Sequence, residues 1–349
     1  MYAFSRNNKK ALNSISLSIH FIFLFIMLGW ARGAYDIEIG ILRYNNFADF
    51  QSFTEVGYSI LIELAHKLNL DYRDFFLLTA FAELTTLFWF VKKNTVKSPI
   101  VLGIFLIWPL CTFFQYTRNL LAFTFIIIGF DYLINHKKHY GLKYIFCCLL
   151  AASIHFSSLF FLLYLAISFL SKKTTFIVTI LGFILLYFSF GLSLFSYLIE
   201  VFVGTTRAGV VARSVNEPDG MVGRTLGILL YILMFFSMYL ILEKIYKVKM
   251  TDRKSDLIYK INTLSILFIP LTIYYGIGFA RFPILIIIFN YCFFVSKISY
   301  LKAQKKRLFL YLILSIFILG ILYINARNEE YRNLVIYPFF QQNELINSI

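Results

Sequence analysis

Charge is scarce in this chain, and acidic residues are scarcer than basic ones. Only 15% of its 349 residues are charged, with 18 Asp and Glu against 33 Lys and Arg, whereas 60% are hydrophobic. Soluble domains are nearer half apolar and a quarter charged. Because a water-soluble fold could not cover so much Phe, Leu and Ile, the composition predicts a protein whose solvent is the lipid bilayer.

Cysteines are few, and the common nucleotide and metal motifs are missing. The four cysteines all lie in apolar segments, which indicates neither a disulfide framework nor a zinc site. The sequence has no P-loop, GxGxxG, HExxH or DxD-like pair, so it predicts no metal or cofactor and argues against an enzyme driven by cytosolic nucleotides. The formal charge of +15 does not call for nucleic acid, because the cytoplasmic Lys and Arg of a membrane protein give the same excess.

Nine apolar segments are near the length of about 20 residues that crosses a bilayer. The first is too long for a signal-peptide core, so we interpret it as an uncleaved span. Residues 55–68 are amphipathic and predict an interfacial helix, whereas residues 142–170 are too long for one span and short for two. The nine segments are 11–31, 73–91, 98–116, 118–135, 174–201, 225–245, 260–277, 281–297 and 308–325.

The positive-inside rule resolves the ambiguity at 142–170. If the N-terminus is cytoplasmic and the chain breaks near Ser153 and turns back, 22 of the 33 basic residues lie in cytoplasmic segments. The sequence therefore predicts an all-α polytopic integral membrane protein with about eleven membrane segments and an external C-terminus. We expect one domain over 1–349, with an external loop at 32–72 that holds the interfacial helix and an external Arg-rich loop at 203–224.

Arginine is concentrated on the predicted external side. Ten of the eleven basic residues expected there are Arg, whereas nearly all of those expected inside are Lys. Arg presents a planar fork that binds carboxylate or phosphate through two hydrogen bonds, whereas Lys is a hydrated point charge. We therefore predict an external anion site, although each arginine can instead pair with an acidic residue of the external loops. The candidate binding residues are Arg32, Gln115, Arg118, Arg207, Arg213, Arg224 and Arg281.

Four titratable residues are candidates for proton transfer. His155, within LAASIHFSSLF, lies near the outer leaflet at the predicted break, as a hydrogen-bonding strut, as a donor to a sugar or phosphate oxygen, or as a proton shuttle. Glu83 lies mid-span, where a carboxyl group is a functional-site hypothesis unless a neighbouring helix pairs with it. Asp36 and Glu55 lie in the first external loop, where an acid could activate a hydroxyl group.

Five short motifs follow one another along the chain. They are Arg32-Gly33-Ala34-Tyr35-Asp36, Glu55-Val56-Gly57-Tyr58, Arg118-Asn119-Leu120-Leu121-Ala122, Ala152-Ser153-Ile154-His155-Phe156-Ser157, and the late Arg281. In order and spacing these motifs resemble the EpsG family of bacterial exopolysaccharide polymerases, which are relatives of the Wzy-type O-antigen and capsule polymerases. The chain departs from the family pattern in two ways: Tyr35 and Asp36 stand in reversed order, and Asn119 replaces a Gln.

The resemblance implies a multi-pass glycosyltransferase that works at the outer face of the bacterial plasma (inner) membrane. Its substrates would be oligosaccharide repeat units on undecaprenyl diphosphate, and a flippase and a chain-length regulator of the same pathway are implied partners. The external arginines would clamp the diphosphate leaving group. Asp36, Glu55 or Glu83 would accept the proton of the acceptor hydroxyl.

Other classes of membrane protein remain open at this point. A lipid-linked oligosaccharide flippase or other transporter is one, although transporters often show internal repeats with broken helices, and this sequence has one broken region and no second copy. A ligase that moves finished glycan to a final acceptor, as in O-antigen ligation, is another. A membrane O-acyltransferase would need inward-facing polar chemistry, whereas the predicted inner loops are short and Lys-rich.

Overall fold

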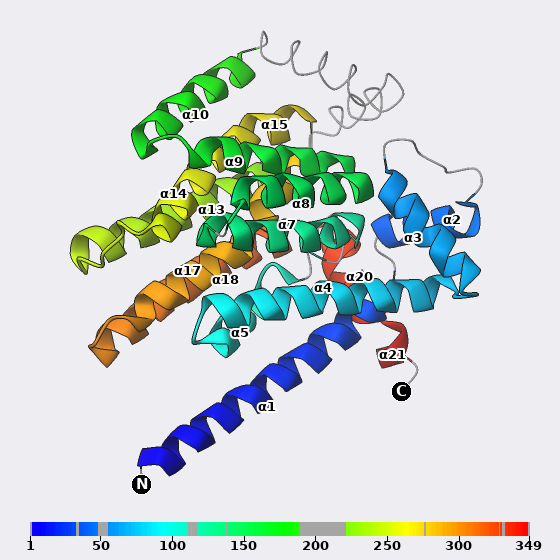
Figure 1. Cartoon of the computed structure of the whole chain (residues 1–349), viewed down its shortest axis with the longest axis horizontal. Helices are drawn as coiled ribbons and strands as arrows, with labels where there is room; N and C mark the ends of the chain where they lie inside the picture. Colours follow the sequence, from blue (N-terminus) through cyan, green and yellow to red (C-terminus); the bar gives the residue numbers. More distant parts are fainter. Residues whose placement is uncertain are drawn as a thin grey trace. The chain divides into compact units, whose positions relative to one another are not determined.

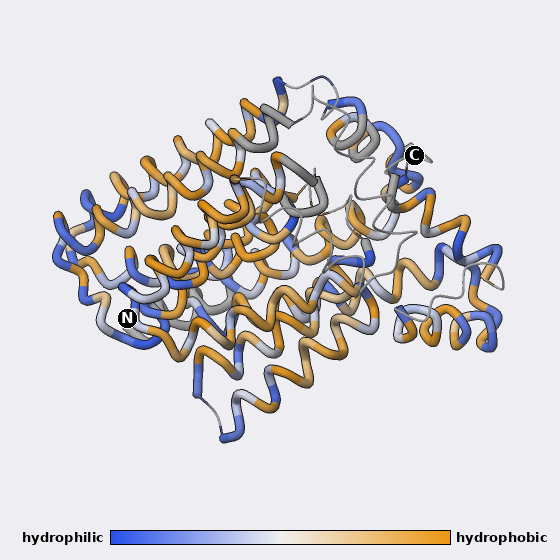
Figure 2. Tube along the Cα trace, turned by 90° about the horizontal axis from the view of Figure 1, so that it is seen from above, coloured by the Kyte–Doolittle hydropathy of each residue, from blue (hydrophilic) through white to orange (hydrophobic). Residues whose placement is uncertain are grey.

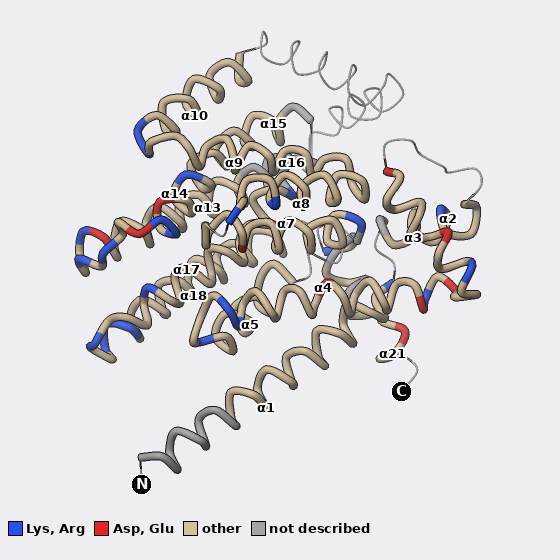
Figure 3. The backbone as a smooth tube through the Cα atoms, in the orientation of Figure 1, with Lys and Arg blue, Asp and Glu red and all other residues tan. Residues whose placement is uncertain are grey.

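The computed structural model of the chain consists of helices and their connections (Figure 1). It describes residues 2–32, 35–47, 55–110, 113, 117–136, 138–188, 221–275, 277–327, 329 and 332–347. These residues contain no strand, which confirms the predicted all-α class. Figure 2 shows hydrophobic residues along the helices, and Figure 3 shows Lys and Arg mainly near helix ends.

Several of the helices match the predicted spans. Within the described part of the chain, seven helices are long and apolar enough to cross a membrane. The chain is therefore a multi-pass membrane protein, while the count of about eleven segments and the cytoplasmic N-terminus stay predictions. The seven are Leu12–Gly29, Tyr72–Asn94, Arg118–Asn135, Leu226–Ile245, Arg253–Ile273, Arg281–Ser299 and Gln304–Arg327.

Contacts between residues divide the chain into two compact units. The first consists of Met1–Leu162, Tyr291–Ser299 and Tyr331–Ile349, and the second of Leu163–Asn290 and Tyr300–Glu330. The two units therefore alternate along the sequence, and late segments return to the unit that contains the first helix. The expected single domain over 1–349 stays a prediction.

The first unit is built mainly from helices of the N-terminal half. They are α1 (Tyr2–Gly29), α2 (Tyr35–Asn45), α3 (Val56–Lys67), α4 (Tyr72–Asn94), α5 (Ser98–Ile107), α7 (Thr117–Asn135) and α8 (Tyr140–Ile154). α4 packs against α1 and α7, and α7 packs along α8 (Figure 1). Gly129 allows the approach of α7 to α8, because a Cβ there would lie 2.9 Å from the Cβ of Cys147 and 3.1 Å from the Tyr144 ring.

The predicted break in 142–170 is confirmed and lies at His155. α8 ends at Ile154, His155 is extended with φ −144° and ψ 110°, and a 3₁₀ helix follows over Phe156–Phe161. The Tyr144 hydroxyl donates a hydrogen bond of 2.8 Å to the carbonyl of Phe161, so the chain turns back along α8. At 15 residues, α8 rises about 22 Å, less than the roughly 30 Å of bilayer hydrocarbon.

The predicted external loop 32–72 contains two helices rather than one. α3 confirms the helix expected over 55–68, although its interfacial position stays a prediction. α2 was not predicted from the sequence, and its buried Ile37 and Tyr44 turn one face toward the start of α4. The Tyr44 hydroxyl donates to the carbonyl of Leu70 at 2.7 Å. At Gly40 a Cβ would lie 2.5 Å from the Tyr72 hydroxyl, so glycine permits this docking.

The second unit has a polar contact inside its apolar core. Its helices include α10 (Lys172–Tyr187), α13 (Met221–Leu240), α14 (Arg253–Leu264), α15 (Phe268–Tyr275), α16 (Ile277–Leu285) and α18 (Gln304–Arg327). The buried Tyr231 hydroxyl donates to Asn262 Oδ1 at 2.8 Å, and Asn262 Nδ2 donates to Asn290 Oδ1 at 2.8 Å. Asn290 lies in α17 (Ile287–Ser299), so the three buried side chains satisfy one another across three helices.

Two predicted boundaries differ from the structure. α5 ends at Ile107, short of the predicted end at residue 116, because a residue that precedes proline disfavours helical geometry and Trp108 before Pro109 is extended. The predicted external loop 203–224 ends too late, since α13 begins at Met221; the apolar run from Leu226 extends one turn toward the N-terminus. Residues 203–220 lie outside the described part of the chain, and the predicted span 174–201 is described only to residue 188.

Candidate functional site

Three residues that sequence reasoning selected separately meet at the carboxylate of Glu55. Arg118 Nη1 lies 2.9 Å from Glu55 Oε2, and His155 Nδ1 lies 3.0 Å from Glu55 Oε1. Glu55 precedes α3, Arg118 lies in the first turn of α7, and His155 is the break after α8. Only 4% of the Glu55 side chain is exposed, against 12% for Arg118 and 17% for His155.

A fourth residue, Arg43, was missed as a site residue. Its Nη1 atom lies 3.4 Å from Glu55 Oε2, so two arginines share one carboxylate. Arg43 is in the last turn of α2, the helix that the sequence did not predict. The one signal available was its membership of the external arginines. We refer to Arg43, Glu55, Arg118 and His155 as the Glu55 cluster.

The Glu55 cluster has a buried donor beyond its contacts with Glu55. Two guanidinium groups contact one carboxylate. Arg118 Nε is also buried and has no hydrogen-bond partner among the described residues, so it could donate to a bound anion. With Nδ1 of His155 hydrogen-bonded to the carboxylate, Nε2 is the ring nitrogen that could exchange a proton with a bound molecule. The cluster can therefore bind an anion and move a proton.

The local sequence brings Glu55 to His155 through Gly57 and Ser153. A Cβ at position 57 would overlap the Ser153 side chain and lie 3.1 Å from the Ser153 carbonyl carbon, so only glycine lets α3 approach the end of α8 this closely. The Ser153 hydroxyl donates to the carbonyl of Leu150 at 2.7 Å, which satisfies a carbonyl near the end of α8. The Glu-x-Gly and Ser-x-His motifs thus contact each other, Gly57 against Ser153 and Glu55 against His155.

A second carboxylate, that of Glu344, also takes up two arginines. Arg32 Nε lies 2.6 Å from Glu344 Oε1, and Arg73 Nη2 contacts Glu344 Oε2. Glu344 opens α21 (Glu344–Asn347), and its backbone N–H donates to the carbonyl of Trp30 at 2.9 Å. We refer to Arg32, Arg73 and Glu344 as the Glu344 cluster. Sequence reasoning listed Arg32 as an anion ligand and did not foresee that its partner is Glu344.

The two arginines set the ionisation of Glu344. Partial burial acts to raise the pKa of its carboxyl group, but hydrogen bonds and charge from Arg32 and Arg73 act in the other direction and prevail. The pKa of Glu344 is therefore lower than its usual value of 4.5. At neutral pH this residue is an anion bound between two cations.

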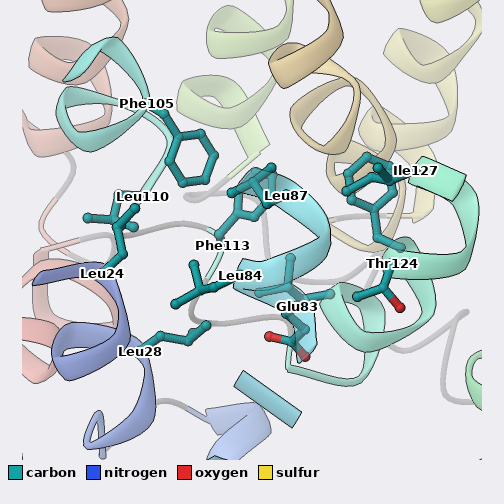
Figure 4. Close-up of a pocket in the computed structure, with 12 residues that line it drawn as sticks. Leu24, Leu28, Glu83, Leu84, Leu87, Phe105, Leu110, Phe113, Thr124 and Ile127 are labelled. Carbon is teal, nitrogen blue, oxygen red and sulfur yellow. The ribbon is translucent and has the colours of Figure 1, made fainter. Parts of the chain in front are cut away.

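Glu83 lies apart from both clusters, in the packed interior of α4. Its side chain lines a small cavity of about 20 Å³ that α1, α4, α5 and α7 surround (Figure 4), enough for about one water. The lining is apolar apart from Glu83 and Thr124, whose hydroxyl donates to the carbonyl of Leu121 at 2.7 Å. Between described residues, no hydrogen bond or ion pair reaches Glu83. Its catalytic role stays a prediction.

Of the six remaining candidates, the structure describes the side chain of Arg281 alone. Arg281 lies in α16 of the second unit, with part of its surface exposed. Asp36 lies in α2 and Arg224 in α13, where only the backbone is described. Gln115, Arg207 and Arg213 lie outside the described residues. The roles assigned to these six residues stay predictions.

Contacts within the first unit join residues that were expected on the same side of the membrane. All members of the Glu55 and Glu344 clusters come from predicted external segments or, for His155, from the outer leaflet. On the predicted cytoplasmic side, Lys93 Nζ lies 2.6 Å from the buried carboxylate of Asp131.

Among the described residues no group of three or more His, Cys, Asp or Glu could hold a metal ion.

These features define a polytopic helical membrane protein with a buried Arg–Glu–His cluster at the end of a broken helix. The chain belongs to the EpsG family, whose family model matches residues 13–340 and so includes the whole Glu55 cluster. This family is associated with Wzy-type polysaccharide polymerases. Glu344 lies beyond the matched residues. Neither the curated proteins nor the solved structures include a match to the chain.

Proposed function

We propose that this protein is a polysaccharide polymerase of the bacterial plasma membrane, acting at the outer face. It transfers a glycan from undecaprenyl diphosphate to a sugar hydroxyl of the next lipid-linked repeat unit. The observation that carries the proposal is the Glu55 cluster, which combines two arginines, one with an unused buried donor, with a histidine held by a carboxylate. Family membership supports the polymerase class.

Arg118 and Arg43 hold the diphosphate leaving group in this proposal. As the glycosidic bond breaks, its electron pair moves to the diphosphate oxygen, and negative charge grows there. Fixed guanidinium groups in a largely buried site stabilise that charge more than water can. Arg118 Nε is buried and has no hydrogen-bond partner among the described residues, so a donor remains beyond the Glu55 contact.

His155 accepts the proton of the attacking hydroxyl. The hydroxyl oxygen forms the new bond to the anomeric carbon while its proton passes to His155 Nε2, and water later removes the proton from the ring. Glu55 holds Nδ1 and fixes the ring orientation and tautomer. Glu55 acts here as a positioning residue rather than as the base. No nucleotide takes part in this scheme, because the lipid diphosphate already activates the donor.

The outer-face location receives support from the pairing pattern. Every member of the Glu55 cluster was assigned to the external side from the distribution of Lys and Arg. Four residues from four chain segments would rarely meet if that assignment mixed the two sides. The substrate is also bound to a lipid, which suits a cluster that lies at the end of a helix too short to cross the bilayer.

Deletion of the gene, followed by analysis of lipid-linked glycans, tests the polymerase assignment. We expect single repeat units to accumulate on the lipid carrier and long chains to disappear. Loss of single units from the outer face would instead favour a flippase, and long chains that remain on the lipid carrier would favour a ligase. An acyltransferase would leave the chain length unchanged.

Complementation with His155→Asn tests the histidine within that assay. The Asn amide can reproduce the Nδ1 hydrogen bond to Glu55, but it cannot accept a proton where Nε2 stands. We therefore expect a correctly inserted protein that makes little polymer. Wild-type chain lengths from this variant would show that His155 is only a strut.

A further inference from the structure

The Glu344 cluster has more hydrogen-bond donors than its carboxylate can use. Arg32 contributes Nε and Arg73 contributes Nη2 to the two oxygens of Glu344. Arg32 Nη1 and Arg73 Nε are also buried, and neither has a hydrogen-bond partner among the described residues. Buried donors are rarely left without an acceptor. The arrangement therefore has places for more acceptor oxygens than one carboxylate supplies.

A phosphate group matches these donors better than a carboxylate does. It offers at least three terminal or bridging oxygens and carries up to two charges, and arginine forks bind it bidentately. Two guanidinium groups against one carboxylate leave a net positive charge, which a phosphate dianion would remove. The Tyr72 ring lies 5.6 Å from Arg32 Cζ and helps to hold this guanidinium in place.

The cluster is accessible, unlike the Glu55 cluster. The exposed fraction is 42% for the Arg73 side chain and 35% for Glu344. Glu344 belongs to α21, a helix of four residues. The preceding residue, Asn343, connects this helix to the end of α1, because its Nδ2 donates a hydrogen bond of 3.2 Å to the carbonyl of Ile26. For α21 to move away from the arginines, the bond of Asn343 to α1 and the bond from the Glu344 N–H to the carbonyl of Trp30 must also break.

We propose that Arg32 and Arg73 form a second oxyanion site, which Glu344 fills in this structure and which a phosphate group takes when Glu344 is displaced. Glu344 is then an internal competitor, and α21 is the segment that moves when ligand binds. The site shares no residue with the Glu55 cluster. The phosphate belongs either to a soluble diphosphate or to a lipid-borne one, and the chemistry of recognition is the same; for the lipid-borne source the inference rests on the proposed function, whose substrate is a lipid diphosphate.

A spin label on α21 measures the displacement directly. Ile346→Cys places the label on an exposed position of α21, and the unsubstituted protein, treated identically, gives the background from native cysteines. The full-length protein is studied in phosphatidylcholine nanodiscs with inorganic pyrophosphate. We expect the mobile fraction of the label to rise with pyrophosphate and to saturate. A second arm uses nanodiscs that contain a polyprenyl diphosphate lipid, which distinguishes the two sources of phosphate.

Glu344→Gln removes the competitor and provides the affinity measurement. If Glu344 occupies the site nine-tenths of the time, its removal should tighten pyrophosphate binding about tenfold by calorimetry. Arg73→Gln should abolish the label response, and Arg73→Lys, as the milder change, should weaken it. Arg307→Gln, in a predicted cytoplasmic segment, is the matched control outside the site and should leave the label response intact.

Two outcomes would overturn the inference. One is a label that keeps its mobility in both arms at every concentration, which would make Glu344 a permanent attachment of the C-terminal segment. The other is a label response that survives Arg73→Gln. Either result leaves the glycan analysis of the deletion strain unaffected, so failure here is distinct from failure of the polymerase assignment.

Discussion

The Glu55 and Glu344 clusters contain the same ionic unit in different surroundings. In each, one carboxylate accepts from two arginines; Arg43 lies 12 residues from its partner, and the other three lie at least 63 residues away. The Glu55 carboxylate is 4% exposed and also contacts His155, whereas Glu344 is 35% exposed and has no histidine partner among the described residues. Glu55 lies within the family match and Glu344 beyond it.

The difference shows that arginine content alone does not define a reaction site. The Glu344 carboxylate is 35% exposed, so water competes for its contacts with the arginines and it can be exchanged. The 4% exposed Glu55 carboxylate lies where charge interactions are stronger, and His155 adds a route for the proton. Burial and the histidine thus separate a site suited to chemistry from one suited to exchangeable binding.

Removal of each carboxylate should give the largest contrast. In Glu55→Gln the buried arginines lose their counter-charge, and we expect a loss of about 3–5 kcal/mol in unfolding free energy together with loss of polymer. Glu344→Gln should cost about 1 kcal/mol or less, because its pair is exposed. Thermal unfolding in detergent measures both, and Glu63→Gln, on the exposed face of α3, is the control. Equal destabilisation by the two substitutions would remove the contrast.

The geometry of the buried arginine should matter as much as its charge. Arg118→Lys keeps the charge but loses the planar fork, and we expect polymer synthesis to fall on the order of 100-fold while the protein still inserts. Arg307→Lys, in a predicted cytoplasmic segment, is the matched control and should keep polymer synthesis. Wild-type chain lengths from Arg118→Lys would show that a point charge is sufficient.

The close approach at Gly57 should make the Glu55 cluster sensitive to a single methyl group. Gly57→Ala drives a Cβ into Ser153, and we expect a cost of about 1–3 kcal/mol with reduced polymer, partly restored by adding Ser153→Gly. Gly320→Ala is the control, since no heavy atom lies within 4 Å of the Cβ position. In α18 that change should stabilise the protein by about 0.5–1 kcal/mol. Comparable unfolding temperatures for both alanine variants would contradict the steric argument.

Acid should loosen the Glu344 cluster. A carboxyl group whose pKa is lower in the folded protein contributes its full stability above its unfolded pKa and loses it as pH falls through the folded pKa. For Glu344 that window lies below 4.5. We expect a label at Ile346→Cys to gain mobility over this range in the wild-type background. In Glu344→Gln the mobility should stay constant with pH, and a titration that persists there would assign the effect to another group.

Hydropathy and charge predicted most of the membrane helices, because each span is a continuous apolar stretch that can be recognised without knowing its partners. The break near His155 followed from two signals together: residues 142–170 fit neither one span nor two, and the positive-inside rule requires the chain to turn back there. α2 was missed because its sequence YDIEIGILRYN is short and mixes polar with apolar residues. Its position depends on hydrogen bonds with Tyr72 and with the carbonyl of Leu70 rather than on a long apolar stretch.

The candidate site was predicted as residues but not as contacts. Glu55, Arg118 and His155 each carried a local reason for attention, yet Arg118 lies 63 and His155 lies 100 residues from Glu55. Their meeting depends on Gly57 and Ser153 in packed helices, which no local pattern encodes. Arg43 and Glu344 were missed for the same reason, since a charged residue does not indicate its partner across the chain.

The position of Glu344 has a practical consequence for mapping the topology of this protein. Glu344 lies 271 residues after Arg73, yet both belong to the unit that contains the first helix. Topology is often mapped with reporters fused to proteins truncated from the C-terminus. Each truncated protein would lack Glu344, so Arg32 and Arg73 would lose their carboxylate partner. Cysteine accessibility in the intact chain, or reporters inserted between helices, would keep that attachment while the orientation is read.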